Sequence, residues 1–237
     1  MRAQAPPPGV SRPVLSTRIP ADFEQMLQVR RGGQSGHATW SWAVQQGRYR
    51  SELRAQWRGE TKGQGAAAAL DWASSGGLDS HGVAPDRFIS RPAKGGARAV
   101  NFQRDSGIVS YSGPTGQAGL QPGAQDRLSW LVQLLAIAQA HPSGQGLPER
   151  LPLWVAGPQG DGADWWFEVQ WHASHRCWQF TRRPERRYEV QVQAWLAMDA
   201  ASAQAHLVHL EMGPEGSRQP PWQFWDAAHP GRCGHPP

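Results

Sequence analysis

The sequence predicts a mainly β protein in which a curved antiparallel sheet, a half-barrel or open barrel, wraps around one central α-helix. Most segments between glycine- and proline-rich turns alternate apolar and polar residues with a period of two, which is typical of half-buried strands. One segment, near residues 126–141, instead carries apolar residues at helical spacing. Because a sheet that is apolar on one face must cover that face, we expect the helix to pack inside the curve.

The first strands follow a proline-rich stretch. In HATWSWAV, Trp40 and Trp42 share one face, and in RYRSELRAQW, Tyr49 and Leu53 share a face while arginines and glutamates occupy the other. The QQG between these segments predicts a hairpin turn. A second hairpin is expected around RDSG, with strands over 97–103 and 108–112. This pattern indicates a meander with one solvated face.

The helical segment has start and stop signals of its own. Pro122 and Gly123 end the preceding strand, Asp126 is placed as an N-cap or first-turn acid, and Pro142 stops the helix. Asp126 beside Arg127 also allows a buried ion pair or a functional dyad, although a cap is the commoner role. Apolar residues cover nearly the whole circumference: Leu128, Trp130, Leu131, Val132, Leu134, Leu135, Ile137 and Ala138. A helix of this kind is buried on most sides.

Strands resume after the helix in DWWFEVQWH, CWQF and YEVQVQAWL, and AHLVHLEM with PWQFW predicts a last hairpin. The chain shows no internal repeat and no linker, so we expect one β-rich domain over residues 21–226. Residues 1–20 are expected to form a proline-rich disordered leader, and residues 227–237 a disordered tail.

The composition limits the classes of function. The net charge of +5, with 24 basic and 19 acidic residues, favours anionic surroundings, but it is also explained by solubility because no long basic block occurs. The 13 tryptophans fall mostly on predicted strand faces, so we expect no nucleic-acid partner. No stretch reaches the roughly 18 apolar residues of a membrane helix, so no transmembrane segment is expected in this chain.

Catalytic signatures are missing from the sequence. The nucleophile-elbow, zinc-protease, phosphate-loop and dinucleotide patterns do not occur, so we expect a non-enzymatic protein without a cofactor. An unrecognised hydrolase stays open, because one sequence does not reveal a dispersed triad. No metal site is expected; the weak candidates are His175 and Cys177, which share a strand face, and surface histidines near a turn explain them better.

One basic cluster is a candidate anion site. Arginines flank Pro184 in TRRPERR, at a predicted turn between strands. Charge-assisted hydrogen bonds from such a cluster suit phosphate or lipid head groups, whereas the alternative is a solvated turn. The candidates are Arg182, Arg183, Arg186 and Arg187.

Several of these segments together resemble a known family. The stretch LQPGAQDRLSWLVQLLAIA, with GGLDSHGVAPDRFISRP and ARAVNFQRDSGIVSYSG upstream and RRPERRYEVQVQAWL downstream, is similar to the bacterial domain of unknown function 3108 family, from about Ala21 to Trp225. The resemblance implies an exported or inner-membrane-anchored envelope protein of Gram-negative bacteria, in the periplasm. It also implies a signal or anchor helix ahead of a linker, of which this sequence has only the linker-like APPPGVSRP. The family offers no established catalytic residues.

Two non-enzymatic functions are therefore expected. The first is binding of a lipid or other amphiphile in an apolar space between sheet and helix; the side chains expected to line it are Trp40, Trp42, Trp130, Leu131, Leu134 and Leu135. The second is a structural or interaction role with a packed core, in which an edge strand or the arginine turn docks an envelope protein partner. A fully packed interface between sheet and helix argues against the first.

Overall fold

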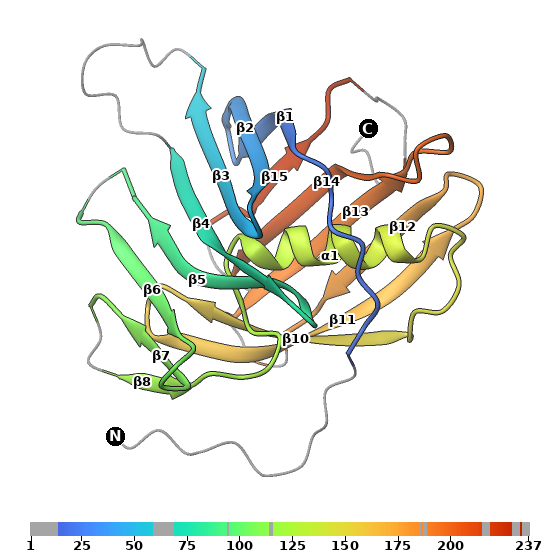
Figure 1. Cartoon of the computed structure of the whole chain (residues 1–237). Helices are drawn as coiled ribbons and strands as arrows, with labels where there is room; N and C mark the ends of the chain where they lie inside the picture. Colours follow the sequence, from blue (N-terminus) through green and yellow to red (C-terminus); the bar gives the residue numbers. More distant parts are fainter. Residues whose placement is uncertain are drawn as a thin grey trace.

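The computed structural model describes residues 14–58, 69–93, 95–113, 116–184, 186, 189–214, 219–228 and 233. These residues form one large open sheet and one short helix, α1 (Ser129–Ala140) (Figure 1). The prediction of a mainly β protein with a single helix is confirmed. No helix among the described residues is long and apolar enough to cross a membrane.

The first half of the sheet is an antiparallel meander in which each strand pairs with the next along the chain. Its strands are β1 (Phe23–Arg31), β2 (Gln34–Gln45), β3 (Arg48–Trp57), β4 (Leu70–Asp79), β5 (Gly82–Ser90), β6 (Arg98–Gln103), β7 (Ile108–Tyr111) and β8 (Gln117–Gly119). Gln46 and Gly47 connect β2 to β3 with φ of 51° and 73°, which is the hairpin geometry expected at QQG. The expected hairpin around RDSG is formed by β6 and β7.

The second half starts with a short strand just before the helix, continues after the helix and returns to the first half. Its strands are β9 (Gln125–Asp126), β10 (Arg150–Gly157), β11 (Asp161–His172), β12 (Cys177–Arg182), β13 (Val190–Met198), β14 (Ala205–Pro214) and β15 (Trp222–Trp225). The last strand, β15, pairs antiparallel with β1, so the two meanders form one sheet with β8 and β9 at its edges. The short β9 pairs with β10 in parallel.

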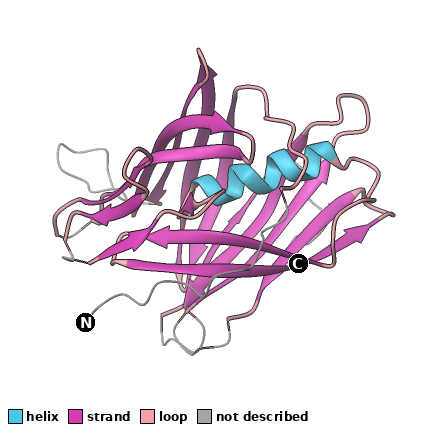
Figure 2. Ribbon diagram, turned by 60° about the horizontal axis from the view of Figure 1, so that its bottom comes forward, coloured by secondary structure: helices cyan, strands magenta, loops and turns pink. Residues whose placement is uncertain are grey.

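Helix α1 contacts β5 and β9 on one side and β13 and β14 on the other, so it lies between the two halves of the chain (Figures 1 and 2). Residues 129–139 are all buried, as the apolar circumference predicted. The buried polar side chains of α1 form hydrogen bonds with backbone groups outside the helix. Gln133 accepts the Val83 N–H (2.8 Å) and donates to the His81 carbonyl (2.7 Å). These bonds fix the helix to the start of β5.

The helix starts later than the sequence suggested. Its N-cap is Leu128, whose side chain makes no capping hydrogen bond, and Asp126 lies two residues earlier, in β9. The Asp126 carboxylate nevertheless accepts the N–H groups of Leu128 (2.7 Å) and Ser129 (2.8 Å). It thus satisfies amides that the first turn leaves free, from outside the cap position.

Both expected terminal segments include residues that pack on the domain. Within the expected leader, Arg18 donates its N–H to the Ala136 carbonyl of α1 (2.9 Å), and the Pro20 carbonyl accepts the Trp42 indole N–H (3.2 Å). Residues 1–13 of that leader lie outside the described residues. Within the expected tail, Cys233 is buried and forms a disulfide with Cys177, 56 residues earlier. The packed part of the chain therefore extends beyond residues 21–226 at both ends.

Candidate functional site

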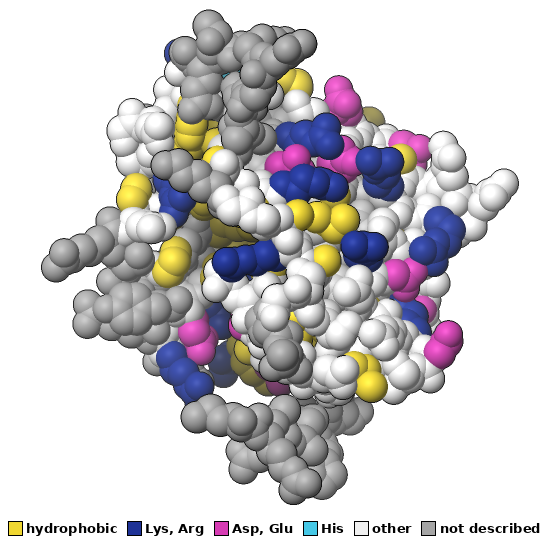
Figure 3. Space-filling view, turned by 90° about the vertical axis from the view of Figure 1, so that its left-hand side faces the viewer, with side chains coloured by type: hydrophobic (Ala, Val, Ile, Leu, Met, Phe, Trp, Pro, Cys, Tyr) yellow, Lys and Arg dark blue, Asp and Glu magenta, His cyan; other side chains and the backbone are white. Residues whose placement is uncertain are grey.

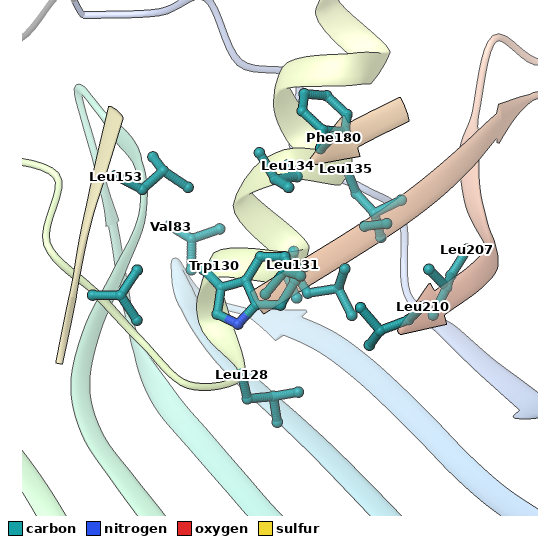
Figure 4. Packing of buried hydrophobic residues seen from close by; sticks show 14 of the residues in the cluster. Val83, Leu128, Trp130, Leu131, Leu134, Leu135, Leu153, Phe180, Leu207 and Leu210 are labelled. Atoms are coloured by element: carbon teal, nitrogen blue, oxygen red, sulfur yellow. The ribbon is translucent and has the colours of Figure 1, made fainter. Parts of the chain in front are cut away.

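The six side chains predicted to line an internal cavity are packed into the core. Each is at most 2% exposed: Trp40, Trp42, Trp130, Leu131, Leu134 and Leu135. The Trp130 ring lies 5.7 Å from the rings of both Trp165 and Phe167, measured between centroids. Figure 4 shows Trp130, Leu131 and Leu134 among other buried apolar side chains. None of the six lines the crevice at Trp154 or the surface hollows at Thr39, Arg183 and Phe102.

The indole N–H groups of this interior also have partners. Trp130 donates to the Arg127 carbonyl (3.1 Å) and Trp40 to the Ser51 hydroxyl (3.1 Å). A buried indole that has found its hydrogen bond is held in one orientation. A ligand at these positions would have to break such bonds and displace packed rings, so the six residues act as core.

The motif residues Pro122 and Gly123 lie at the helix side of the sheet, in the wall of a crevice of about 30 Å³. His81, Gln133 and Trp154 also line it. A space of this size is close to that of one water molecule. The crevice is therefore too small for a lipid or amphiphile.

Asp126 is the centre of a buried hydrogen-bond network. Its carboxylate accepts the Ser74 hydroxyl (2.6 Å), and that hydroxyl also lies 2.8 Å from the Tyr49 hydroxyl. Burial raises the pKa of Asp126 to about 6, against the hydrogen bonds from Ser74, Ser129 and Leu128, which lower it. Because Ser74 belongs to β4 and Asp126 to β9, the network joins the first half of the sheet to its far edge.

Arg127 does not pair with Asp126, so the predicted ion pair or dyad is not formed. Its guanidinium instead contacts the Asp161 carboxylate and lies 4.7 Å from the Trp165 ring centroid. The reason is local geometry: Asp126 faces the core, where backbone amides and Ser74 satisfy it, and Arg127 points to the end of β11. Arg127 therefore links the start of the helix to β11.

The weak metal candidates are also separated. Cys177 is engaged in the disulfide with Cys233 and is not a free thiolate, whereas His175 lies in the exposed turn before β12. Among the described residues, no three histidine, cysteine, aspartate or glutamate side chains gather where they could hold a metal ion.

The arginine turn is the one predicted site that forms a surface hollow. We call it the arginine hollow; it has a volume of about 310 Å³ and is lined by Arg150, Ala163, Asp164, Trp166, Arg182, Arg183, Pro184, Arg186 and Glu189. Three of the four predicted arginines belong to it, and Arg187 lies outside the described residues. Basic side chains outnumber acidic ones in its wall by four to two.

Arg182 forms the fixed floor of the arginine hollow. Its side chain is only 5% exposed, pairs with the Glu189 carboxylate at 2.9 Å and donates to the Val190 carbonyl. Its guanidinium also lies 4.8 Å from the Trp165 ring centroid. Glu189 is engaged by this residue, and the other acid that the described residues place in the wall is Asp164.

Trp166 and Arg150 are among the residues of the hollow that were not predicted from the sequence. Trp166 is 42% exposed, unlike its buried neighbours Trp165 and Phe167, and the Arg150 guanidinium lies 5.4 Å from its ring centroid. The alternation in DWWFEVQWH already places Trp166 on the outer face of its strand, which is a usable signal. Arg150 has no such signal, because β10 is brought beside β11 by pairing alone.

Several arginines elsewhere on the sheet pair with acidic neighbours. On the outer face of β3 to β5, Arg48 pairs with Asp86 (2.7 Å) and Arg91 with Asp71 (3.1 Å). Figure 3, which views the side of the molecule that carries β3 to β8, shows basic and acidic side chains interspersed there. For Arg150, Arg183 and Arg186, the described part of the chain supplies no comparable ion pair.

Comparisons with known proteins show a fold-level likeness only. No family model matches the chain, and no curated protein matches it either. A solved structure, described as a β-barrel-like protein of domain of unknown function 1849 from Brucella abortus, aligns at 11% identity with a TM-score of 0.48. The alignment covers 88% of this chain and 96% of that one. At this likeness, nothing about function transfers between the two proteins.

Proposed function

We propose that the protein is a non-enzymatic binding protein that holds an anionic group of its ligand or partner in the arginine hollow. The observation that carries the proposal is the excess of arginine in one hollow. The hollow is lined by Arg150, Arg183 and Arg186. Of the two described acids in its wall, Glu189 pairs with Arg182, and the other is Asp164. A guanidinium donates to a phosphate or carboxylate in a forked, charge-assisted geometry, so such a cluster suits oxyanions.

The packed interior favours this surface function over binding between sheet and helix. The six side chains expected at an internal site are buried core residues. This supports the alternative in which a packed domain uses its arginine turn to bind. Lipid that copurifies with the native protein would support the internal site instead.

We further propose that the protein works in an oxidising compartment, the periplasm or the envelope. The disulfide between Cys177 and Cys233 supports this, because such bonds persist where thiols are not kept reduced. Resemblance to the domain of unknown function 3108 family agrees with the location, and membership stays a prediction.

The test of the proposed function is the thermal stability of the full chain in inorganic phosphate or sulfate, compared with chloride at equal ionic strength. A ligand that binds only the folded state raises the melting temperature with its concentration. We expect the rise in wild type and its loss in Arg183→Gln with Arg186→Gln. The matched control, Arg87→Gln with Arg98→Gln, removes the same charge from exposed positions outside the hollow. An equal rise in all three proteins would contradict the proposal.

A further inference from the structure

We propose that the arginine hollow binds the phosphate head group of an anionic phospholipid at a membrane surface, with the acyl chains left in the bilayer. The inference rests on the proposed function, since it names the ligand of the same hollow. Three features of the structure lead to it: the size of the hollow, the packing of the interior and the exposed tryptophan at the hollow.

The size of the hollow fits a head group and not a whole lipid. Its volume of about 310 Å³ lies at the lower end of the roughly 300–1,000 Å³ of ligand pockets. Its wall is mainly charged, with four arginines and two acids. Acyl chains gain nothing from such a wall, whereas a phosphate gains charge-assisted hydrogen bonds.

The interior leaves the acyl chains no place in the protein. A carrier needs an apolar space beside its head-group site, and the nearest apolar region is the core around Trp130, Trp165 and Phe167. These three side chains are at most 3% exposed and lie in mutual ring contact. An apolar tail attached to a phosphate in the hollow therefore stays outside the protein.

Trp166 is suited to the interface where such tails begin. It is one of three large apolar side chains that are well exposed in the described structure, together with Val14 and Met26, and the one that lies in the hollow. Tryptophan is enriched at the boundary between water and hydrocarbon, because its ring is apolar and its N–H is polar. Arg150, stacked on this ring, can keep its aliphatic stem on the ring while its charge faces phosphate.

The charge of the hollow is matched to an anionic surface. Arg183 and Arg186 are exposed, and Arg182 is held below them by Glu189 and by the Val190 carbonyl. Basic residues near a membrane are attracted to anionic lipids and not to zwitterionic ones. A free phosphorylated molecule offers the same phosphate chemistry, and the experiment separates these two sources.

The experiment is cosedimentation of the full chain with vesicles of phosphatidylcholine, alone or mixed with phosphatidylglycerol, at physiological salt. We expect binding to the mixed vesicles only. Arg183→Gln with Arg186→Gln should weaken it about thirtyfold, from roughly fivefold for each arginine near the surface. Trp166→Ala should weaken vesicle binding roughly tenfold through lost apolar contact. The control pair Arg87→Gln with Arg98→Gln should bind like wild type.

Each contrary outcome has a distinct meaning. If phosphate stabilises the protein through the hollow but mixed vesicles do not bind, the site takes a soluble phosphate compound and this inference fails while the proposed function stands. If the control pair weakens vesicle binding as much as the hollow pair, the net charge of +5 is responsible and the inference fails. If neither phosphate nor vesicles bind, the proposed function fails as well.

Discussion

The interior between sheet and helix and the arginine hollow differ in how their polar groups are satisfied. In the interior, the indole N–H groups of Trp40 and Trp130 and the amide of Gln133 all have protein partners. In the hollow, Arg182 is tied to the protein in this way, whereas Arg183 and Arg186 are exposed. The first region therefore stabilises the fold, and the second has hydrogen-bond donors and charge left for a ligand.

The largest effect should come from the interior. Trp130→Ala removes a fully buried ring that contacts Trp165 and Phe167, and leaves a cavity. We expect a loss of about 3–5 kcal/mol in the free energy of unfolding, measured by urea denaturation. The matched control is Trp166→Ala on β11, which should cost under about 0.5 kcal/mol because its ring is exposed. Equal losses in the two variants would erase the distinction between the regions.

The disulfide should contribute next. Cys233→Ser frees the segment after β15 from β12, where Cys177 packs with Ala197 and Val208. A loop of this length predicts a loss of about 2–4 kcal/mol in unfolding free energy. Urea denaturation with and without reductant measures it: reduced wild type should unfold like the variant, and the variant should not respond to reductant. If reductant left the unfolding free energy of wild type unchanged, the disulfide would contribute nothing to stability.

Asp126 makes the interior sensitive to pH. Its folded pKa of about 6 lies above the value of an ordinary aspartate, so the folded state binds the proton more tightly. The stability contributed by the protonated carboxyl is complete below pH of about 4 and is lost as pH rises through about 6. The loss is about 3 kcal/mol for a shift of this size.

Asp126→Asn tests this pH dependence. The amide keeps an oxygen for the N–H groups of Leu128 and Ser129 and presents its nitrogen to the Ser74 hydroxyl. Relative to the variant, wild type should lose unfolding free energy between pH 4 and pH 6, measured by urea denaturation across that range. Parallel pH profiles for the two proteins would exclude Asp126 as the titrating group.

The difference between the interior and the hollow also shows which parts of the structure the sequence could predict. Alternation identified the strands, and the apolar circumference of the helix correctly predicted its burial, because both depend on local spacing. The sequence could not tell a packed interior from a cavity: whether Trp130 meets Trp165 and Phe167 depends on strand pairing far along the chain. Likewise, Arg150 reaches the hollow only through the pairing of β10 with β11, and Cys177 reaches Cys233 only through tertiary folding.

The smallest expected effect on stability belongs to the hollow. Arg183→Gln with Arg186→Gln should change the unfolding free energy by less than about 0.5 kcal/mol, because both side chains are exposed. Arg182→Gln is the matched contrast within the same hollow: it removes the bond to the Val190 carbonyl, the pair with Glu189 and the stacking on Trp165. We expect it to cost about 1–3 kcal/mol, since Arg182 is itself buried and its charged hydrogen bonds are lost.

Urea denaturation and the phosphate-dependent melting temperature, measured on both arginine variants, complete the comparison. Arg183→Gln with Arg186→Gln should lose the response of the melting temperature to phosphate and keep its unfolding free energy. Arg182→Gln should have a lower unfolding free energy than wild type. If the exposed pair were as destabilising as Arg182→Gln, Arg183 and Arg186 would be structural residues like those of the interior. The arginine hollow would then have no donors left for a ligand, and the difference between the two regions would disappear.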